Sequence, residues 1–256
     1  MGLRGPRSLT GRSDVGGRLA AAGPLVQLRA DAAVRTVPLA ALRCEHFVGS
    51  SPWRRFRSRQ GQQHLSGEYW AATTAGHVVF ESQLELARLM LADFDVDVAA
   101  IYAQPFRLTA TVEGVTRSHV PDFLLVSVGG TATVVNVKPA GRLADAAVAA
   151  ALAWPEALVI GHGWRWEVWS GCDPVLLDNV RFLAGYRRPW VVAADEVRKA
   201  CEAVGEGTRL SVVERRLAGA APAHTVRPAV LAALWHGRLV TDLTELLSGE
   251  SMVWRP

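Results

Sequence analysis

The feature that most constrains the fold is a change of hydrophobic pattern near the middle of the chain. Leu84, Ala87 and Leu91 recur at helical spacing, with polar residues on the opposite side, so an amphipathic helix is predicted from Phe80 onward. The chain then changes to short β-type runs separated by glycine turns, which predicts an antiparallel meander. The predicted runs are 99–104, 106–112, 120–128 and 131–137, with turns at 113–114 and 129–130.

The pattern after this meander predicts an α/β fold, a mixed sheet with flanking helices. An alanine-rich helix is expected at 142–153, then short strands at 157–160 and 164–169. Beyond residue 171 the sequence pattern predicts mainly helices. Three helices at 195–204, 210–217 and 228–235, followed by short β pieces at 238–243 and 251–254, outline a winged-helix-like module.

Charge is distributed unevenly along the chain. The net charge is only +4, but residues 1–60 hold 11 arginines against three acidic residues and therefore carry +8. A basic arm attached to a mildly acidic body favours a polyanion partner such as nucleic acid, although such an arm can also be a solvated tail. The segment Trp53–Arg59 interleaves aromatic residues with arginines, which suits phosphate contacts and stacking or, equally, a plain solvated edge.

These observations predict three parts: a partly irregular basic N-terminal arm at 1–60, an α/β domain at 61–171 and a winged-helix-like domain at 172–256. No apolar run reaches the roughly 20 residues of a membrane helix, because Asp145, Pro155 and Glu156 interrupt the best candidate. The N-terminus has no secretory signal pattern. The three cysteines are far apart, which disfavours a disulfide framework or a zinc site. We expect a soluble, cytoplasmic protein.

Acidic and basic residues gather on the hairpin that joins residues 120–128 to 131–137. Asp122 stands at the start of one strand and Lys138 at the end of the next, and Asn136 shares a face with Lys138 because strand residues alternate. A two-residue loop at 129–130 would place Asp122 on the other face. An odd loop or a bulge would instead put Asp122 opposite Lys138, with Asn136 diagonal to it, and we predict that register.

One more carboxylate can reach this group. Glu85 lies on the polar stripe of the preceding helix, at the edge that packing would turn toward the rim of the sheet. Two carboxylates can hold Mg²⁺, which bridges naturally to phosphate, and a lysine beside them would orient water or stabilise charge on phosphorus. Lys138 is one of only two lysines in the chain. The combination predicts phosphodiester hydrolysis.

The same residues resemble the core of the PD-(D/E)xK nucleases, in which Pro121-Asp122, Asn136-Val137-Lys138 and Glu85 form the motif. The chain more closely resembles the TnsA-type endonuclease subunit of heteromeric transposases, over about Gly67 to Trp169. The motifs that carry this resemblance are Phe80-Glu81-Ser82-Gln83-Leu84-Glu85, Gln104-Pro105-Phe106, His119-Val120-Pro121-Asp122-Phe123 and Val137-Lys138-Pro139.

The resemblance implies a restriction-endonuclease-like core in residues 61–171 and a metal-dependent DNA endonuclease activity that cuts one strand at the 5′ end of a transposon. It implies Glu85, Asp122 and Lys138 as catalytic residues. Mg²⁺, or Mn²⁺ in its place, would be held by Glu85 and Asp122 with oxygens from Asn136 and Val137. The implied partners are double-stranded DNA at the transposon ends, a DDE-type transposase subunit and an ATPase regulator.

Some assignments have alternatives. Asn136 stands where the general nuclease pattern has Asp or Glu, which leaves metal binding more dependent on the two carboxylates, and TnsA-type proteins tolerate an amide there. Glu81 is the rival of Glu85 as a ligand. Other functions remain open: a stand-alone PD-(D/E)xK nuclease of restriction or repair, or a catalytically silent DNA-binding assembly subunit.

The same residues also have plain structural interpretations. Glu85 with Arg88 has the spacing of an exposed helix ion pair. His119 could bind phosphate or shuttle a proton, but a hydrogen-bonded structural histidine is favoured. Gln104 could reach the site or be a sheet-edge amide. The alternating tryptophans at 164–169 favour a packed strand face over a base-stacking platform.

Overall fold

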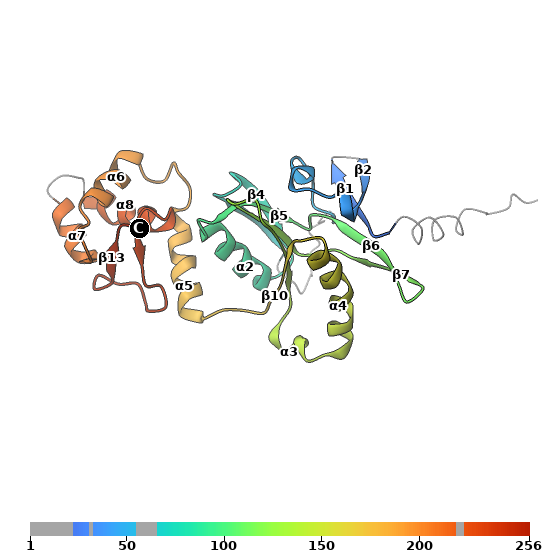
Figure 1. Ribbon diagram of the computed structural model, residues 1–256. Coiled ribbons are helices and arrows are strands. Elements are labelled where there is room, and N and C mark those ends of the chain that lie inside the picture. The colour runs from blue at the N-terminus through green and yellow to red at the C-terminus, as the bar shows by residue number, and fades with distance from the viewer. Residues whose placement is uncertain (1–22, 31–32, 55–65, 219–222) are drawn as a thin grey trace, which may run out of the picture.

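The protein has two lobes joined by helix α5 (Pro174–Leu183), as the computed structural model in Figure 1 shows. The structure describes residues 23–30, 33–54, 66–218 and 223–256. The larger lobe, up to about residue 172, holds two four-stranded sheets and a hairpin, and the smaller lobe holds helices and a three-stranded sheet. None of the described helices is long and apolar enough to cross a membrane.

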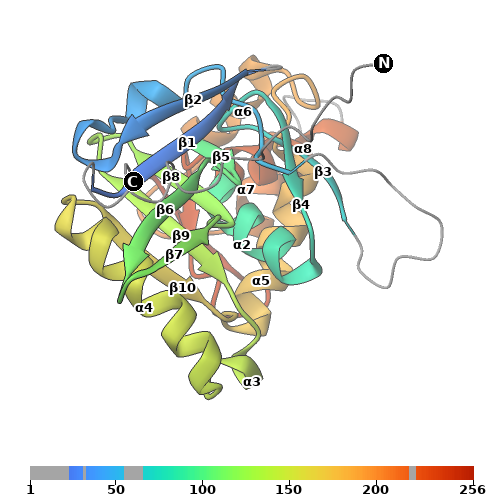
Figure 2. The same ribbon diagram turned by 90° about the vertical axis from the view of Figure 1, so that its right-hand side faces the viewer.

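The central sheet of the larger lobe is mixed. Its strand order is β10-β9-β8-β5, with β9 and β10 parallel and the other neighbours antiparallel. Helix α2 (Gln83–Phe94) packs on one face through Leu89 and Ala92, and helix α4 (Ala146–Gly161) packs on the other through Val159. Figure 2 shows the two helices on either side of the sheet. The strands are β5 (Val98–Ala103), β8 (Phe123–Ser127), β9 (Ala132–Val137) and β10 (Arg165–Trp169). This arrangement confirms the mixed α/β class.

The second sheet shows that the predicted meander is wrong. Its order is β2-β1-β6-β7, so β6 belongs to this sheet and not to the central one. In the central sheet β5 therefore pairs with β8, and not with β6 as a meander would require. Val26 and Leu108 are both fully buried and stand in register between β1 and β6. Local pattern identifies the strand at 107–112 but not its partner, because β1 lies about 80 residues earlier in the chain. These strands are β1 (Leu25–Ala30), β2 (Ala33–Pro38), β6 (Arg107–Val112) and β7 (Val115–His119).

The described part of the predicted N-terminal arm, residues 23–30 and 33–54, has more regular structure than predicted. Besides β1 and β2, they form two short 3₁₀ helices, Leu39–Ala41 and Cys44–Phe47. Val26 and Phe47 belong to the same buried cluster as β6 and β9 residues, so residues 23–30 and 33–54 are part of the larger lobe. The remaining positions of the predicted arm, including its first 22 residues, lie outside the described residues.

Helix α4 extends further than predicted. It begins after the N-cap Asp145, whose carboxylate accepts a hydrogen bond from the Ala147 N–H at 2.9 Å, and it continues through Pro155 to Gly161. The expected strand at 157–160 is therefore wrong. Leu152, Pro155 and Val159 are buried at helical spacing. Val159 belongs to the cluster on this face of the sheet, and the helix continues although Pro155 removes one backbone hydrogen bond.

The hairpin of β8 and β9 has a different register from the predicted one. Phe123 pairs with Val135 and Leu124 with Val134, and the loop has three residues, an odd number as expected. The pairing is nevertheless shifted by two positions, so extension of the ladder places Asp122 opposite Asn136 and not opposite Lys138. A shift of two keeps the parity of the faces.

The smaller lobe contains α6 (Ala194–Glu202), α7 (Leu210–Leu217) and α8 (Ala223–Trp235), near the predicted positions. Its sheet has the order β11-β13-β12, formed by β11 (Thr208–Arg209), β12 (Val240–Thr241) and β13 (Met252–Trp254). The seven residues from Ala229 to Trp235 are all buried, so this part of α8 forms the centre of the lobe. Met90, Leu91 and Phe94 of α2 pack against the same cluster and connect the two lobes.

Candidate active site

Asp122 and Lys138 meet at one end of the β8–β9 pair. Asp122 directly precedes β8 and Lys138 directly follows β9, and antiparallel pairing brings these ends together. The Asp122 carboxylate accepts a hydrogen bond from the Val137 N–H at 2.6 Å, and the Lys138 ammonium lies 3.4 Å from the same oxygen. Two of the predicted catalytic residues are therefore in contact.

Glu85 lies at the N-terminus of α2, close enough to Asp122 for the two charges to repel. Burial raises the pKa of Glu85 to about 7; the hydrogen bond from the Glu81 N–H opposes this shift, and the charges of Asp122 and Glu81 add to it. Both carboxylate oxygens also accept local bonds, from the Glu81 N–H at 2.7 Å and the Ser82 hydroxyl at 3.2 Å. Glu85 therefore helps to cap the helix. Its carboxylate is also in a place where burial and neighbouring charges disfavour the ionised form.

Glu81, the rival ligand, faces a different partner. Its carboxylate accepts a hydrogen bond from the Arg54 guanidinium at 2.9 Å. This ion pair compensates its charge, whereas Glu85 has no cation bonded to it among the interactions of the described residues. The electrostatics therefore favour Glu85 as the carboxylate that gains most from a nearby cation.

Arg88 does not form the expected helix ion pair with Glu85. Its guanidinium instead forms a bidentate ion pair with Glu167 on β10, in which Nε donates to Oε1 at 2.8 Å and Nη2 donates to Oε2 at 2.9 Å. This contact ties the first half of α2 to the edge strand of the central sheet. It fixes the helix turn that carries Glu85.

Asn136 is buried beneath the site and contacts His119. The amide oxygen lies 2.7 Å from His119 Nε2, and the amide nitrogen has no hydrogen-bond partner. Burial lowers the pKa of His119, whose ring packs near Trp154 and Trp166. This environment matches the structural interpretation of His119 and engages the oxygen that Asn136 was expected to offer to a metal.

The Val137 carbonyl is also engaged, because it accepts a hydrogen bond from the Lys138 ammonium at 2.9 Å. Among the interactions of the described residues, Asp122 Oδ1 accepts no hydrogen bond, whereas each Glu85 oxygen already accepts one, so Glu85 would bind a cation in addition to these bonds or in exchange for them. Mg²⁺ is commonly held by one or two carboxylates together with water and substrate phosphate. Among the described residues no three His, Cys, Asp or Glu side chains cluster as a metal site. Glu85 and Asp122 would supply at most two carboxylates to Mg²⁺, and water and a substrate phosphate would have to supply the other ligands.

Gln104 is part of the site, although the sequence pattern favoured a sheet-edge amide. It is 4 % exposed, its N–H donates to the Asp122 carbonyl at 2.8 Å, and its side chain accepts from the Arg54 N–H at 3.0 Å. Arg54 itself was missed as a site residue. The aromatic and basic pattern at Trp53–Arg59 was the available signal, but it does not show that residue 54 returns to the carboxylates.

The tryptophans at 164, 166 and 169, in β10 and just before it, pack mainly against the core. Trp164 and Trp166 pack against the cluster on the α4 side of the sheet, and Trp169 packs on the α2 side. Their packing against the core is confirmed, but the prediction that they share one face is wrong, because Trp169 lies on the face opposite to Trp164 and Trp166.

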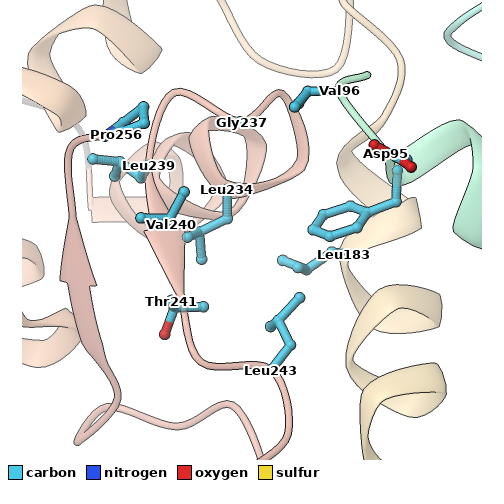
Figure 3. A pocket seen from close by; sticks show the side chains of 11 residues that line it. Asp95, Val96, Leu183, Leu234, Gly237, Leu239, Val240, Thr241, Leu243 and Pro256 are labelled. Carbon is cyan, nitrogen blue, oxygen red and sulfur yellow. The ribbon is translucent and has the colours of Figure 1, made fainter. Parts of the chain in front are cut away.

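A well-formed apolar pocket lies away from these polar residues, at the junction of the lobes. Its volume is about 380 Å³. Figure 3 shows Leu183, Leu234 and Leu243 around it, with Asp95 and Val96 at one side. It has no acid–base pair comparable to Asp122 and Lys138 among its lining residues, so we place the candidate chemistry at the β8–β9 end. No protein-family model matches this chain, and no curated protein is significantly similar to it.

Proposed function

We propose that this chain is a Mg²⁺-dependent DNA endonuclease subunit of a heteromeric transposase, with a restriction-endonuclease-like core. It would hydrolyse a phosphodiester at the 5′ end of a transposon. The observation that carries the proposal is the contact of Asp122 with Lys138 beside the half-buried carboxylate of Glu85. An acid pair next to an ammonium is the equipment for metal-assisted attack of water on phosphorus.

The residues would divide the work as follows. Asp122, fixed by the Val137 N–H, keeps one carboxylate at the end of the sheet. Lys138 places a positive charge where negative charge develops on the phosphate, and its ammonium can orient the attacking water. Glu85 supplies the second carboxylate from α2. A bound Mg²⁺ would neutralise the scissile phosphate and lower the pKa of a water molecule.

The proposed partners are double-stranded DNA, a DDE-type transposase subunit and an ATPase regulator, in a cytoplasmic setting. The lobe beyond residue 172 resembles a winged-helix module in its order of three helices and a three-stranded sheet. A helix that reads DNA needs an exposed polar face. The last seven residues of α8 are buried in the core of the lobe, so this part of the helix is not available for major-groove recognition.

One observation favours a second candidate, a catalytically silent DNA-binding assembly subunit. Both Glu85 oxygens make capping bonds, and the Asn136 oxygen is engaged by His119. In that case the carboxylates would serve the fold alone. A stand-alone nuclease would share the active site but need no transposase.

The test compares the two lysines of the chain. Full-length protein is incubated with Mg²⁺, DNA carrying the element ends and the transposase encoded beside it, and nicking is measured. We expect Lys138→Ala to lower the nicking rate at least about 100-fold while DNA affinity is retained. Lys199→Ala is the matched control, because Lys199 pairs with Glu196 on α6 in the other lobe.

The outcomes separate the candidates. If Lys138→Ala nicks DNA at the same rate as the wild type, the assignment of the site is wrong. Nicking without the transposase indicates the stand-alone enzyme. DNA binding without nicking, and without Mn²⁺ binding in a titration of the purified chain, indicates the silent subunit.

A further inference from the structure

The residues Ser51 to Arg54, here called the 51–54 segment, are held firmly against the candidate active site. The Ser51 N–H donates to the Arg29 carbonyl at 2.8 Å, and the Arg29 guanidinium donates to the Trp53 carbonyl at 2.9 Å. The Trp53 N–H donates to the Gln104 carbonyl at 2.9 Å. The segment is therefore fixed along its backbone, which is unusual for an exposed connection.

Gln104 links this segment directly to Asp122. Its side chain accepts the Arg54 N–H at 3.0 Å, and its own N–H donates to the Asp122 carbonyl at 2.8 Å. Gln104 also has a φ of +44°, in the left-handed region that residues with a Cβ seldom adopt. Such conformations persist only where the surroundings impose them, and they concentrate at functional sites. One buried residue with a left-handed backbone conformation thus connects the backbone of Arg54 to the backbone of Asp122.

The Arg54 side chain is available to a ligand. It is 57 % exposed, and among the described residues its side chain bonds only Glu81, at 2.9 Å in an exposed ion pair. Pairs of this kind contribute little and exchange readily. A phosphate offers a guanidinium two parallel charge-assisted hydrogen bonds, which a single contact with Glu81 does not match. Arg54 can therefore leave Glu81 for a phosphate without disturbing the backbone that Gln104 holds.

Two further arginines, Arg29 and Arg107, contact Trp53, the residue before Arg54. The Arg107 guanidinium lies 4.7 Å from the centre of the Trp53 ring and is anchored by Gln27. Arg29, Arg54 and Arg107 thus form a basic rim beside an acidic centre. A polyanion strand can be held by such a rim while one of its phosphates reaches the carboxylates.

We propose that Arg54 binds a backbone phosphate of the DNA strand whose phosphodiester lies at Asp122 and Lys138, and that Gln104 is the residue that positions it. The inference rests on the proposed function in that DNA is the substrate. It adds a binding residue for the strand to be cut, next to the catalytic group.

The first experiment measures DNA affinity against salt concentration, with Ca²⁺ in place of Mg²⁺, for full-length variants. Loss of one phosphate contact should reduce the slope of log affinity against log salt by about one for Arg54→Ala. Arg198→Ala is the matched control, because this α6 side chain is 56 % exposed and paired at 2.8 Å, much like Arg54. It should keep the wild-type slope.

The second experiment replaces single phosphates around the mapped nick with neutral methylphosphonates. For the wild type we expect one position at which affinity falls about tenfold, the size of a charge-assisted contact. Arg54→Ala should show no further loss at that position. Gln104→Met, which has similar length and no acceptor, should lower the salt slope too, and its double variant with Arg54→Ala should equal Arg54→Ala alone. A purely structural role for Gln104 would lower stability without this equality.

The outcomes distinguish this inference from the proposed function. If the wild type nicks DNA and Lys138→Ala does not, but Arg54→Ala keeps the full salt slope, the inference on Arg54 is wrong and the nuclease assignment stands. If the Arg54 effect is present but nicking never occurs with the transposase, the phosphate contact stands and the nuclease assignment fails. A chain that binds no DNA overturns both.

Discussion

The Lys138 ammonium lies 3.4 Å from the Asp122 carboxylate, although a shorter bond of 2.6 Å from the Val137 N–H holds that carboxylate in place. The backbone, and not the lysine, therefore fixes Asp122. Lys138 is divided between this carboxylate and the Val137 carbonyl at 2.9 Å. The Lys138 ammonium can therefore move toward a substrate while the Val137 N–H still holds Asp122. This suits a residue that acts on an incoming phosphate.

The dual role of Asp122 can be separated by two substitutions. Asp122→Asn keeps an oxygen for the Val137 N–H, so the free energy of unfolding should change by less than about 1 kcal/mol. Asp122→Ala leaves that N–H without an acceptor and should cost about 1–3 kcal/mol. Both should lower metal-dependent nicking at least about 100-fold. Urea unfolding and nicking assays check this, and an Asp122→Asn variant with wild-type nicking would exclude Asp122 as a ligand.

Glu85 should make the metal-free protein less stable as the pH rises. Its pKa is raised from 4.5 to about 7, mainly by burial, so between these values the folded chain keeps a proton that the unfolded chain releases. Stability from this group is therefore lost from pH 4.5 to 7. Glu85→Gln retains the capping geometry and should stabilise the protein above pH 7 by about 1–2 kcal/mol, with allowance for partial exposure.

The measurement is urea unfolding in EDTA between pH 5 and pH 8, with Glu81→Gln as the neighbouring control. The stabilisation by Glu85→Gln should shrink toward pH 5. A constant destabilisation at every pH would mean that Glu85 acts only as a helix cap.

The sequence predicted those parts of the site that depend on local spacing. Helix α2, the odd hairpin loop and the closeness of Asp122 to Lys138 all follow from apolar period and strand alternation. The register did not follow, because the three-residue loop lies at 128–130, closed by the bond from the Ser127 N–H to the Thr131 carbonyl, and not one residue later. The pairing of β6 with β1 and the return of Arg54 to the site depend on contacts across 50 or more residues. Periodicity carries no information about such distant partners.

The contact between Arg88 and Glu167 should be among the more stabilising ion pairs of the larger lobe. The Arg88 side chain is only 13 % exposed and makes two short parallel bonds across 79 positions. Arg88→Ala should cost about 2–3 kcal/mol, because it also leaves Glu167 without its partner. Arg88→Lys should recover only part of this, since an ammonium cannot reproduce the fork. Arg198→Ala, at an exposed pair, should leave the urea unfolding midpoint close to that of the wild type.

Gly237 should control how the two lobes pack, because it lies where the end of α8 approaches the loop between α2 and β5. Its φ is +63°, and an added Cβ would overlap the Val96 side chain across the pocket of Figure 3. Gly237→Ala combines backbone strain with this overlap and should cost about 2–4 kcal/mol. Gly185→Ala is the control, since its Cβ meets no atom within 4 Å and its φ is not positive. Thermal unfolding and limited proteolysis near residue 96 check the prediction; equal melting temperatures for the two variants would show that Val96 can move aside and that the junction is soft.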